Sequence, residues 1–216
     1  MQMHKANGYT RQEILTAIKS HGSMTADGLG KELGISPVAV RQHLAALDAE
    51  GLVATSIERR AVGRPVHLYT ITTLGDETFP RQYDALANSL LDELRHAQGE
   101  EAVEELFAKR RARLVSSHQL RMEGKSIEER VFELARIQDE DGYMASAEAV
   151  EGGYRVVEHN CAVCKVARRH RAVCNQEIAF IRQLLGPHAR VERITHIASG
   201  DAACTYLIVP EANAAG

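Results

Sequence analysis

The sequence predicts an α+β protein, and three observations along the chain support this. Three short amphipathic helical patterns precede two strand-like stretches near the N-terminus. Long helical patterns fill the middle of the chain, and strands alternate with helix towards its end. We place the segment boundaries at 1–75, 76–140 and 141–210.

Composition and charge narrow the class of protein. The chain has 216 residues, 44% of them hydrophobic, which is enough to build a core. Its net charge of −3 is unevenly distributed, because residues 76–150 are acidic and both ends are mildly basic. A uniformly basic nucleic-acid coat is therefore excluded, but a local basic surface is not. The N-terminus lacks a signal peptide and no stretch is long and apolar enough to span a bilayer, so we expect a cytoplasmic protein with no membrane partner.

The first segment has the pattern of a winged helix-turn-helix domain. Ser36 and Pro37 are a strong helix start, with the serine as N-cap and the proline in the first turn. The helix is expected to run over 36–50 and to bury Val40, Leu44 and Leu47. Two strands, over 52–58 and 66–72, then form a hairpin around Gly63 and Pro65.

The opposite side of this helix is suited to reading DNA. Its exposed N-terminal half carries six candidate contact residues: Ser36, Val38, Ala39, Arg41, Gln42 and His43. Arginine can bond guanine and glutamine can bond adenine in the major groove. At the hairpin tip, three arginines could enter a minor groove or pair with phosphates: Arg59, Arg60 and Arg64. The sequence thus predicts binding to double-stranded DNA, with a winged helix used only for protein contacts as the alternative.

The middle segment predicts long helices over 79–97, 100–122 and 126–138. The first carries an apolar stripe: Tyr83, Leu86, Leu90 and Leu94. The basic run 109–113 is expected to pair along its own helix with the preceding glutamates. We expect these helices to pack on one another or across a two-fold axis, and so to form a dimerisation segment.

The last segment contains all four cysteines: Cys161, Cys164, Cys174 and Cys204. In an intracellular chain such a group favours metal or redox chemistry over structural disulfides. Cys174 is predicted to lie directly before a helix over 175–185, and Cys204 to open the last strand, over 203–209. Lys165 and the arginines near it would stabilise thiolates. Three or four thiolates suit an iron–sulfur cluster or a zinc ion.

Other uses of the cysteines remain open. Free cysteines often serve as small buried hydrophobic residues. The C-x2-C pair Cys161 and Cys164 could be the redox pair of a thiol oxidoreductase, an enzyme. That reading leaves Cys174, Cys204 and the N-terminal domain unexplained, so we do not expect catalysis.

Several stretches also resemble a known family. They lie at 33–53, 62–86, 157–161 and 191–204, with Cys174 thirteen positions after Cys161. On these stretches the chain resembles the SufR-like regulators, winged-helix repressors of Suf operons that sense iron–sulfur clusters.

The resemblance implies a homodimer that binds an inverted-repeat operator. It also implies a [4Fe-4S] cluster in each subunit that controls DNA affinity, with Cys161, Cys174 and Cys204 as ligands. Ala162 stands where family members often have proline, and Cys164 is an additional cysteine that could supply the fourth ligand. The function expected from this resemblance is a transcriptional regulator, a repressor of iron–sulfur cluster assembly or related stress genes. A winged-helix regulator with a zinc or thiol redox site is the alternative.

Overall fold

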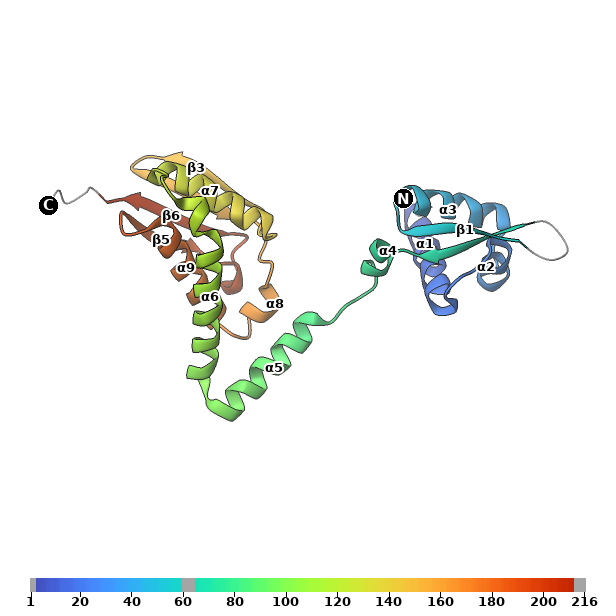
Figure 1. Ribbon diagram of the computed structural model, residues 1–216, viewed down its shortest axis with the longest axis horizontal. Coiled ribbons are helices and arrows are strands. Elements are labelled where there is room, and N and C mark those ends of the chain that lie inside the picture. The colour runs from blue at the N-terminus through green and yellow to red at the C-terminus, as the bar shows by residue number, and fades with distance from the viewer. Residues whose placement is uncertain (1–2, 60–64, 212–216) are drawn as a thin grey trace. The chain divides into compact units, whose positions relative to one another are not determined.

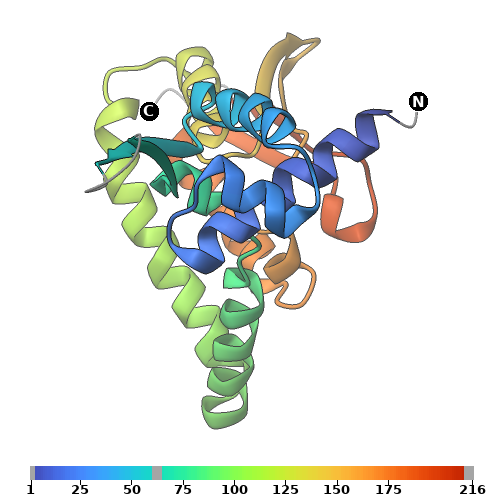
Figure 2. The same ribbon diagram turned by 90° about the vertical axis from the view of Figure 1, so that its right-hand side faces the viewer.

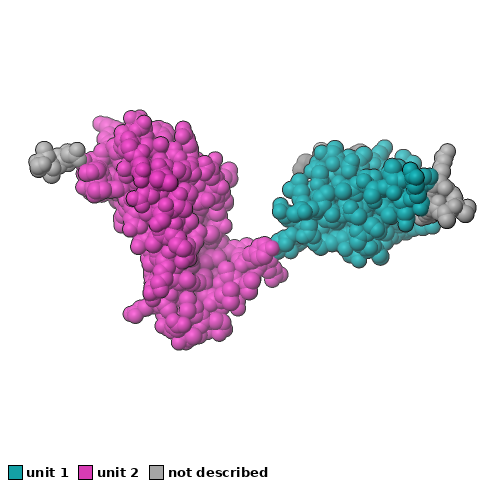
Figure 3. Space-filling model, viewed as in Figure 1, with its two compact units in different colours: residues 1–81 teal, residues 82–216 magenta. Residues whose placement is uncertain are grey.

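The computed structural model describes residues 3–59 and 65–211 and divides the chain into two compact units. Unit 1 is Met1–Arg81 and unit 2 is Gln82–Gly216 (Figures 1 and 3). The helices that sequence analysis placed in the central segment 76–140 lie mainly in unit 2, together with the C-terminal sheet.

Unit 1 contains four helices and a two-stranded antiparallel sheet within its described residues. They are α1 (Met3–His21), α2 (Ala26–Leu33), α3 (Pro37–Ala49), β1 (Val53–Glu58), β2 (Val66–Ile71) and α4 (Thr73–Glu77). Figure 2 shows the blue helices α1 to α3 and the teal hairpin β1–β2 of this unit. This order confirms the predicted winged helix-turn-helix fold.

The core of unit 1 follows the predicted periodicity. Val40, Leu44 and Leu47 are fully buried on one side of α3 and pack with Ile14 and Leu29 of the first two helices. Such burial contributes about 1.5–3 kcal/mol for each large aliphatic side chain. The apolar stripe therefore fixes which side of α3 remains in solvent.

Unit 2 is built around one four-stranded antiparallel sheet of order β3-β4-β6-β5. Its strands are β3 (Ala145–Val150), β4 (Gly153–Glu158), β5 (Ala189–Thr195) and β6 (Cys204–Pro210). Its helical elements are α5 (Tyr83–Gln98), α6 (Glu100–Met122), α7 (Ile127–Glu140), α8 (Cys164–Ala167), α9 (Ala172–Leu185) and the short 3-10 turn η1 (Ile197–Ser199).

The long helices and the sheet share one hydrophobic core. Leu134 of α7 and Ile181 of α9 pack with Tyr206 and Ile208 of the central strand β6. The helices α7 and α9 cover the sheet, and α6 packs against α9. Figure 1 shows α6 running beside the sheet and α5 leading away from it towards the boundary with unit 1.

Two local differences from the predicted elements bear on function. The helix α9 begins at Ala172, so Cys174 lies in its first turn and not before it as predicted. Much of the apolar stripe predicted on α5 does not pack within this chain, because Leu86 and Leu90 are 58% and 62% exposed. The buried face of α5 instead carries Leu91 and Asp92.

Candidate functional site

The exposed side of α3 presents the predicted contact residues of unit 1. The Ser36 side chain accepts a hydrogen bond from the Ala39 amide at 3.2 Å and so caps the helix. Val38, Arg41 and Gln42 are exposed. Ala39 and His43 are half-buried, so the N-terminal half of the helix offers a mixed polar and small apolar surface.

Arg41 already has a partner in the free protein. Its guanidinium lies 2.8 Å from the Asp27 carboxylate of α2, and both side chains are more than half exposed. Exposed ion pairs of this kind contribute only about 0–1 kcal/mol, so the arginine can exchange Asp27 for another acceptor at small cost.

The hairpin of unit 1 is only partly described. Arg59 is exposed just beyond the end of β1. The other two predicted arginines of this tip, Arg60 and Arg64, lie outside the described residues.

The four cysteines are free thiols on four different elements of unit 2. Cys161 and Cys164 are half-buried in the loop after β4 and at the start of α8. Cys174 and Cys204 are buried, in the first turn of α9 and at the start of β6.

Three of these thiols meet around η1. Cys161 and Cys174 share a small apolar cluster with Ala198 of η1. The amide of Ile197, the preceding residue, donates a hydrogen bond to the Cys204 sulfur at 3.3 Å. The fold thus brings segments more than forty residues apart to one end of unit 2, although no three His, Cys, Asp or Glu side chains of residues 3–59 and 65–211 are arranged to hold a metal ion.

The thiols are held in their neutral form. Burial raises the pKa of Cys161 to about 12 and that of Cys204 to about 11. Burial also raises the pKa of Cys174, against the opposing effect of Arg193 and Arg171. Of the predicted cations, Arg171 does favour the Cys174 thiolate, but burial has the larger effect on the pKa of this thiol.

Two of the other predicted cations have carboxylate partners. Lys165 pairs with Asp84 of α5 at 3.0 Å, and Arg169 pairs with Asp92 of the same helix. Their charges therefore compensate carboxylates of α5 instead of the sulfur atoms.

Asp92 lies at the centre of a second group of polar side chains, which we call the Asp92 cluster: Asp92, Arg95, Arg169 and His170. Asp92 is 9% exposed and accepts hydrogen bonds from Arg95 at 2.9 Å and from the Arg169 Nε at 3.1 Å. His170 is 1% exposed, 3.7 Å from Asp92, and neither of its ring nitrogens has a hydrogen-bond partner. The cluster therefore ties α5 to the segment between Cys164 and Cys174.

Sequence reasoning missed this cluster. The available signal was the polar Asp92 next to Leu91 on an otherwise apolar face, together with the arginines at 168, 169 and 171. A buried carboxylate needs a partner of opposite charge, but nothing local in the sequence identifies which arginine supplies it.

Two further carboxyl groups lie near the cysteines. Glu158 is 1% exposed, and burial followed by the nearby Glu177 raises its pKa to about 9. Burial also raises the pKa of Glu177. Glu158 is therefore held neutral near pH 7, and burial shifts Glu177 in the same direction.

Comparisons with known proteins agree with the architecture of unit 1. Residues 9–55 match the family described as "Bacterial regulatory protein, arsR family". A stretch of 66 residues is 32% identical to the probable C4-dicarboxylate response regulator DctR of Bacillus subtilis (strain 168), covering 30% of this chain and 29% of that protein. The match therefore spans less than a third of DctR.

A solved structure also shows similarity, at a low level. The crystal structure of Bacillus subtilis PadR in complex with operator DNA aligns with 82% of this chain and 98% of that one, at 13% identity and a TM-score of 0.29. That score is too low to define a shared fold. Unit 1 is accordingly described as a winged helix-turn-helix domain of the kind found in bacterial regulators, on the evidence of its own elements and of the match over 9–55.

No helix within the described part of the chain has the length and apolar character needed to cross a membrane.

Proposed function

We propose that the protein is a DNA-binding transcriptional regulator that reads its operator with α3. The observation that carries the proposal is the division of this helix into two faces. Val40, Leu44 and Leu47 are fully buried, whereas Arg41 and Gln42 project into solvent. The match of residues 9–55 to a bacterial regulator family supports this assignment.

The exposed face of α3 has the chemistry needed for direct readout. Arg41 and Gln42 can each form two hydrogen bonds with a base edge, to guanine and adenine respectively. Val38 is 63% exposed and suits contact with a thymine methyl group. Arg59 of the wing would contribute phosphate or minor-groove contacts.

The test begins with a pool of randomised DNA duplexes, from which the purified protein selects a preferred site. The affinities of Arg41→Ala and Gln42→Ala for that site are then measured by fluorescence anisotropy at fixed salt. Each is expected to lose roughly 5–150-fold, corresponding to about 1–3 kcal/mol, with relaxed specificity at one base pair.

The control is Asp27→Ala, which removes the partner of Arg41 without removing the arginine. It is expected to bind DNA at least as tightly as the wild type, because the guanidinium no longer exchanges one acceptor for another. Failure to select any sequence, or unchanged affinity in both α3 variants, would contradict the proposal.

We propose further that unit 2 controls this activity through a [4Fe-4S] cluster held by Cys161, Cys174 and Cys204. Their thiols lie on separate elements that meet around η1, and none is in a disulfide, so the chemistry of the donor set suits iron. Because no three such side chains of the described residues are arranged to hold a metal ion, cluster binding would require these segments to move closer together. Cys164, three residues from Cys161, is the candidate fourth ligand. When bound, the cluster would supply a redox-active centre whose loss or oxidation is the signal.

The residues that would pass this signal on lie in α5. The segment between Cys164 and Cys174 is tied to α5 by the Asp92 cluster and by Lys165, which pairs with Asp84 and accepts a hydrogen bond from Asn88 through its carbonyl. Because α5 begins directly after the boundary with unit 1, rearrangement of this segment would release the helix that leads to the DNA-binding domain.

Oxygen-free purification followed by iron and sulfide analysis tests the cluster. We expect about four of each per chain, and an absorption band near roughly 400 nm that is lost in a Cys161→Ser, Cys174→Ser or Cys204→Ser variant. Cys164→Ser determines whether that thiol is a ligand. Stoichiometric zinc without sulfide would favour the alternative site, and dithiol turnover that needs only Cys161 and Cys164 would favour an oxidoreductase.

The link to DNA is tested separately, by comparing the affinities of the loaded and cluster-free forms. Asp92→Asn should keep the cluster and reduce the difference in affinity between the two forms. Equal DNA affinity of the two wild-type forms would contradict control by the cluster and leave the DNA-binding proposal intact.

We also propose that α5 forms a homodimer interface. Leu86 and Leu90 are more than half exposed on one side of this helix, and exposed apolar stripes commonly mark interaction surfaces. A second copy suits the two-fold symmetry of an inverted-repeat operator. Leu86→Asp is expected to give monomers in analytical ultracentrifugation, whereas Leu120→Asp, at a 79% exposed position on α6, should not.

A further inference from the structure

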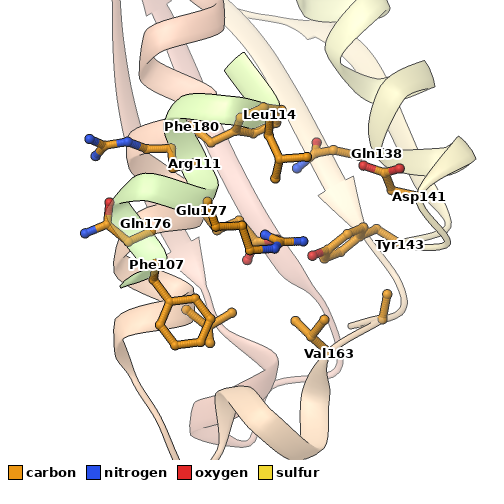
Figure 4. A pocket seen from close by; sticks show the side chains of 13 residues that line it. Phe107, Arg111, Leu114, Gln138, Asp141, Tyr143, Val163, Gln176, Glu177 and Phe180 are labelled. Carbon is orange, nitrogen blue, oxygen red and sulfur yellow. The ribbon is translucent and has the colours of Figure 1, made fainter. Parts of the chain in front are cut away.

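Unit 2 contains a cavity that the proposed function does not use. It lies between α6, α7, α9 and the loop after β4, and has a volume of about 210 Å³ (Figure 4). Clefts for drug-sized molecules usually have about 300–1,000 Å³. Any molecule that this cavity accommodates is therefore small.

Much of the cavity wall is apolar and partly aromatic. Leu114 of α6 and Phe180 of α9 lie at the upper end of the cavity in Figure 4, and Phe107 of α6 and Val163 lie at its lower end. The edge of the Phe180 ring is in turn supported by His118 at a ring distance of 6.2 Å. Aromatic walls in fixed positions favour a flat apolar ligand over a flexible chain.

The remaining lining is polar and incompletely satisfied. Gln138 is 3% exposed, and although its amide nitrogen donates to Glu158, its Oε1 atom is buried without a partner. The Nε atom of Arg111 and the Oε1 atom of Gln176 are also buried without partners. Buried polar atoms normally have partners, so a donor and two acceptors at one cavity point to a polar molecule that completes them.

The charges around the cavity favour an anionic ligand. Arg110 and Arg111 line one side, whereas the acidic lining consists of Asp141 and Glu177. Glu177 is already partnered by the Tyr143 phenol and lies close to Arg110. The basic run 109–113 was predicted to pair with glutamates of its own helix. This is confirmed for Lys109, which pairs with Glu105 at 2.7 Å, whereas Arg110 and Arg111 line the cavity.

We propose that this cavity binds a small aromatic carboxylate that also carries a hydrogen-bond donor. The carboxylate lies against Arg110 and Arg111, the ring lies between Phe107 and Phe180, and the donor meets the free amide oxygen of Gln138. No cysteine lines the cavity among the described residues, although Ala162, Val163 and Val173, which do, are sequence neighbours of Cys161, Cys164 and Cys174.

The experiment uses the full-length protein without iron or DNA, so that its outcome does not depend on the proposed function. Hydroxybenzoate isomers, benzoate and benzamide are titrated by isothermal calorimetry, each up to about 10 mM. We expect at least one hydroxybenzoate to bind with a Kd on the order of 10 µM to 1 mM, benzoate to bind more weakly, and neutral benzamide to bind at least roughly tenfold more weakly.

Two variants on the same helix locate the site. Arg110→Ala alters an exposed residue of the lining and should weaken hydroxybenzoate binding at least about tenfold. Arg113→Ala alters an exposed residue of α6 that does not line the cavity and should leave it unchanged. Absence of binding by all probes, equal binding of benzamide, or equal losses in the two variants would each overturn the proposal.

Discussion

The two units of this chain solve the problem of a stable core in different ways. Among the described residues, the buried side chains of unit 1 are apolar, from Ile14 to Val53. Unit 2 buries five polar or charged residues as well: Asp92, Glu133, Gln138, Glu158 and His170. Burying such groups costs free energy of folding unless each is partnered. An apolar core like that of unit 1 would avoid this cost.

The difference indicates where the chemistry of the molecule lies. Unit 1 keeps its charges on the surface, as on α3, and can act as a rigid module that presents them. Unit 2 buries carboxyl groups, two thiols and a histidine. Perturbed and buried titratable groups concentrate at functional sites, so unit 2 is the better candidate for a chemical site.

The largest effect is expected from core truncation, which tests whether the units unfold separately. Leu44→Ala should destabilise unit 1 by about 2–5 kcal/mol and leave unit 2 unchanged. Leu134→Ala should do the reverse, since both leucines are fully buried in separate cores.

Urea unfolding, monitored by hydrogen exchange in each unit, measures the change in the free energy of unfolding for both variants. Val38→Ala, at an exposed position of α3, is the matched control and should change stability by less than about 0.5 kcal/mol. One cooperative transition that moves as a whole in both core variants would contradict the independence of the units.

Glu158 should make the stability of unit 2 depend on pH in a way that the apolar core of unit 1 does not. Its pKa is about 9 in the folded protein against 4.5 for an ordinary glutamate, so between these values the folded state holds an extra proton. The stability that this group contributes is full below pH 4.5 and is lost as the pH rises towards 9, by at most about 1.4 kcal/mol per pH unit.

Glu158→Gln should therefore gain stability relative to the wild type as the pH is raised from about 6 to 8. Glu148→Gln, at an exposed position on β3, should show no such gain. Denaturation of unit 2 in cluster-free protein at several pH values measures both, and parallel pH curves for Glu158→Gln and the wild type would refute the assignment of a neutral buried carboxyl.

The contrast between the units also explains what could be predicted from the sequence. In unit 1, helix caps and spacing act over a few residues, so Ser36 and the stripe from Val40 to Leu47 predicted α3 and its buried face. In unit 2, the strands and helices were also foreseen, but the partner of Asp92 is 77 residues away. Long-range pairing of charges has no local pattern, and neither does a cavity assembled from three helices.

The same argument applies to the cysteines. Their spacing predicted that distant segments meet, and the segments do meet around η1. What the sequence did not show is the burial of the thiols, which raises their pKa values more than Arg171 lowers that of Cys174. Two other predicted cations, Lys165 and Arg169, pair with α5.

A smaller effect is expected at the ion pair between α6 and α7. Arg121 donates to Glu133 at 2.7 Å and also pairs with Glu140, and the hydrogen bond from Arg121 lowers the pKa of Glu133. Arg121→Met should cost unit 2 about 1–3 kcal/mol at neutral pH, because the buried Glu133 loses its main partner. A lowered pKa gives stability that is present above the ordinary glutamate value of 4.5 and lost as the pH falls, so the wild type should lose its advantage over Arg121→Met in acid.

Chemical denaturation at pH 7 and at about pH 3 measures this difference. Lys109→Met is the control, since its pair with Glu105 is about two-thirds exposed on both sides and should contribute little. A deficit in Arg121→Met that is the same at both pH values would indicate lost packing of the long side chain instead of lost charge pairing.

The smallest effect concerns the start of α3, where stability and recognition can be separated. Ser36→Ala removes the cap on the Ala39 amide and should cost unit 1 about 0.5–2 kcal/mol, whereas Ser36→Asp retains an acceptor there and should cost less. The two variants should rank differently in DNA binding. Aspartate places a negative charge at the helix end that would face the phosphates, so Ser36→Asp should bind DNA more weakly than Ser36→Ala although it is the more stable of the two. If the DNA affinities instead follow the stabilities, the N-terminus of α3 does not lie against DNA, and unit 1 would present its charges to a protein.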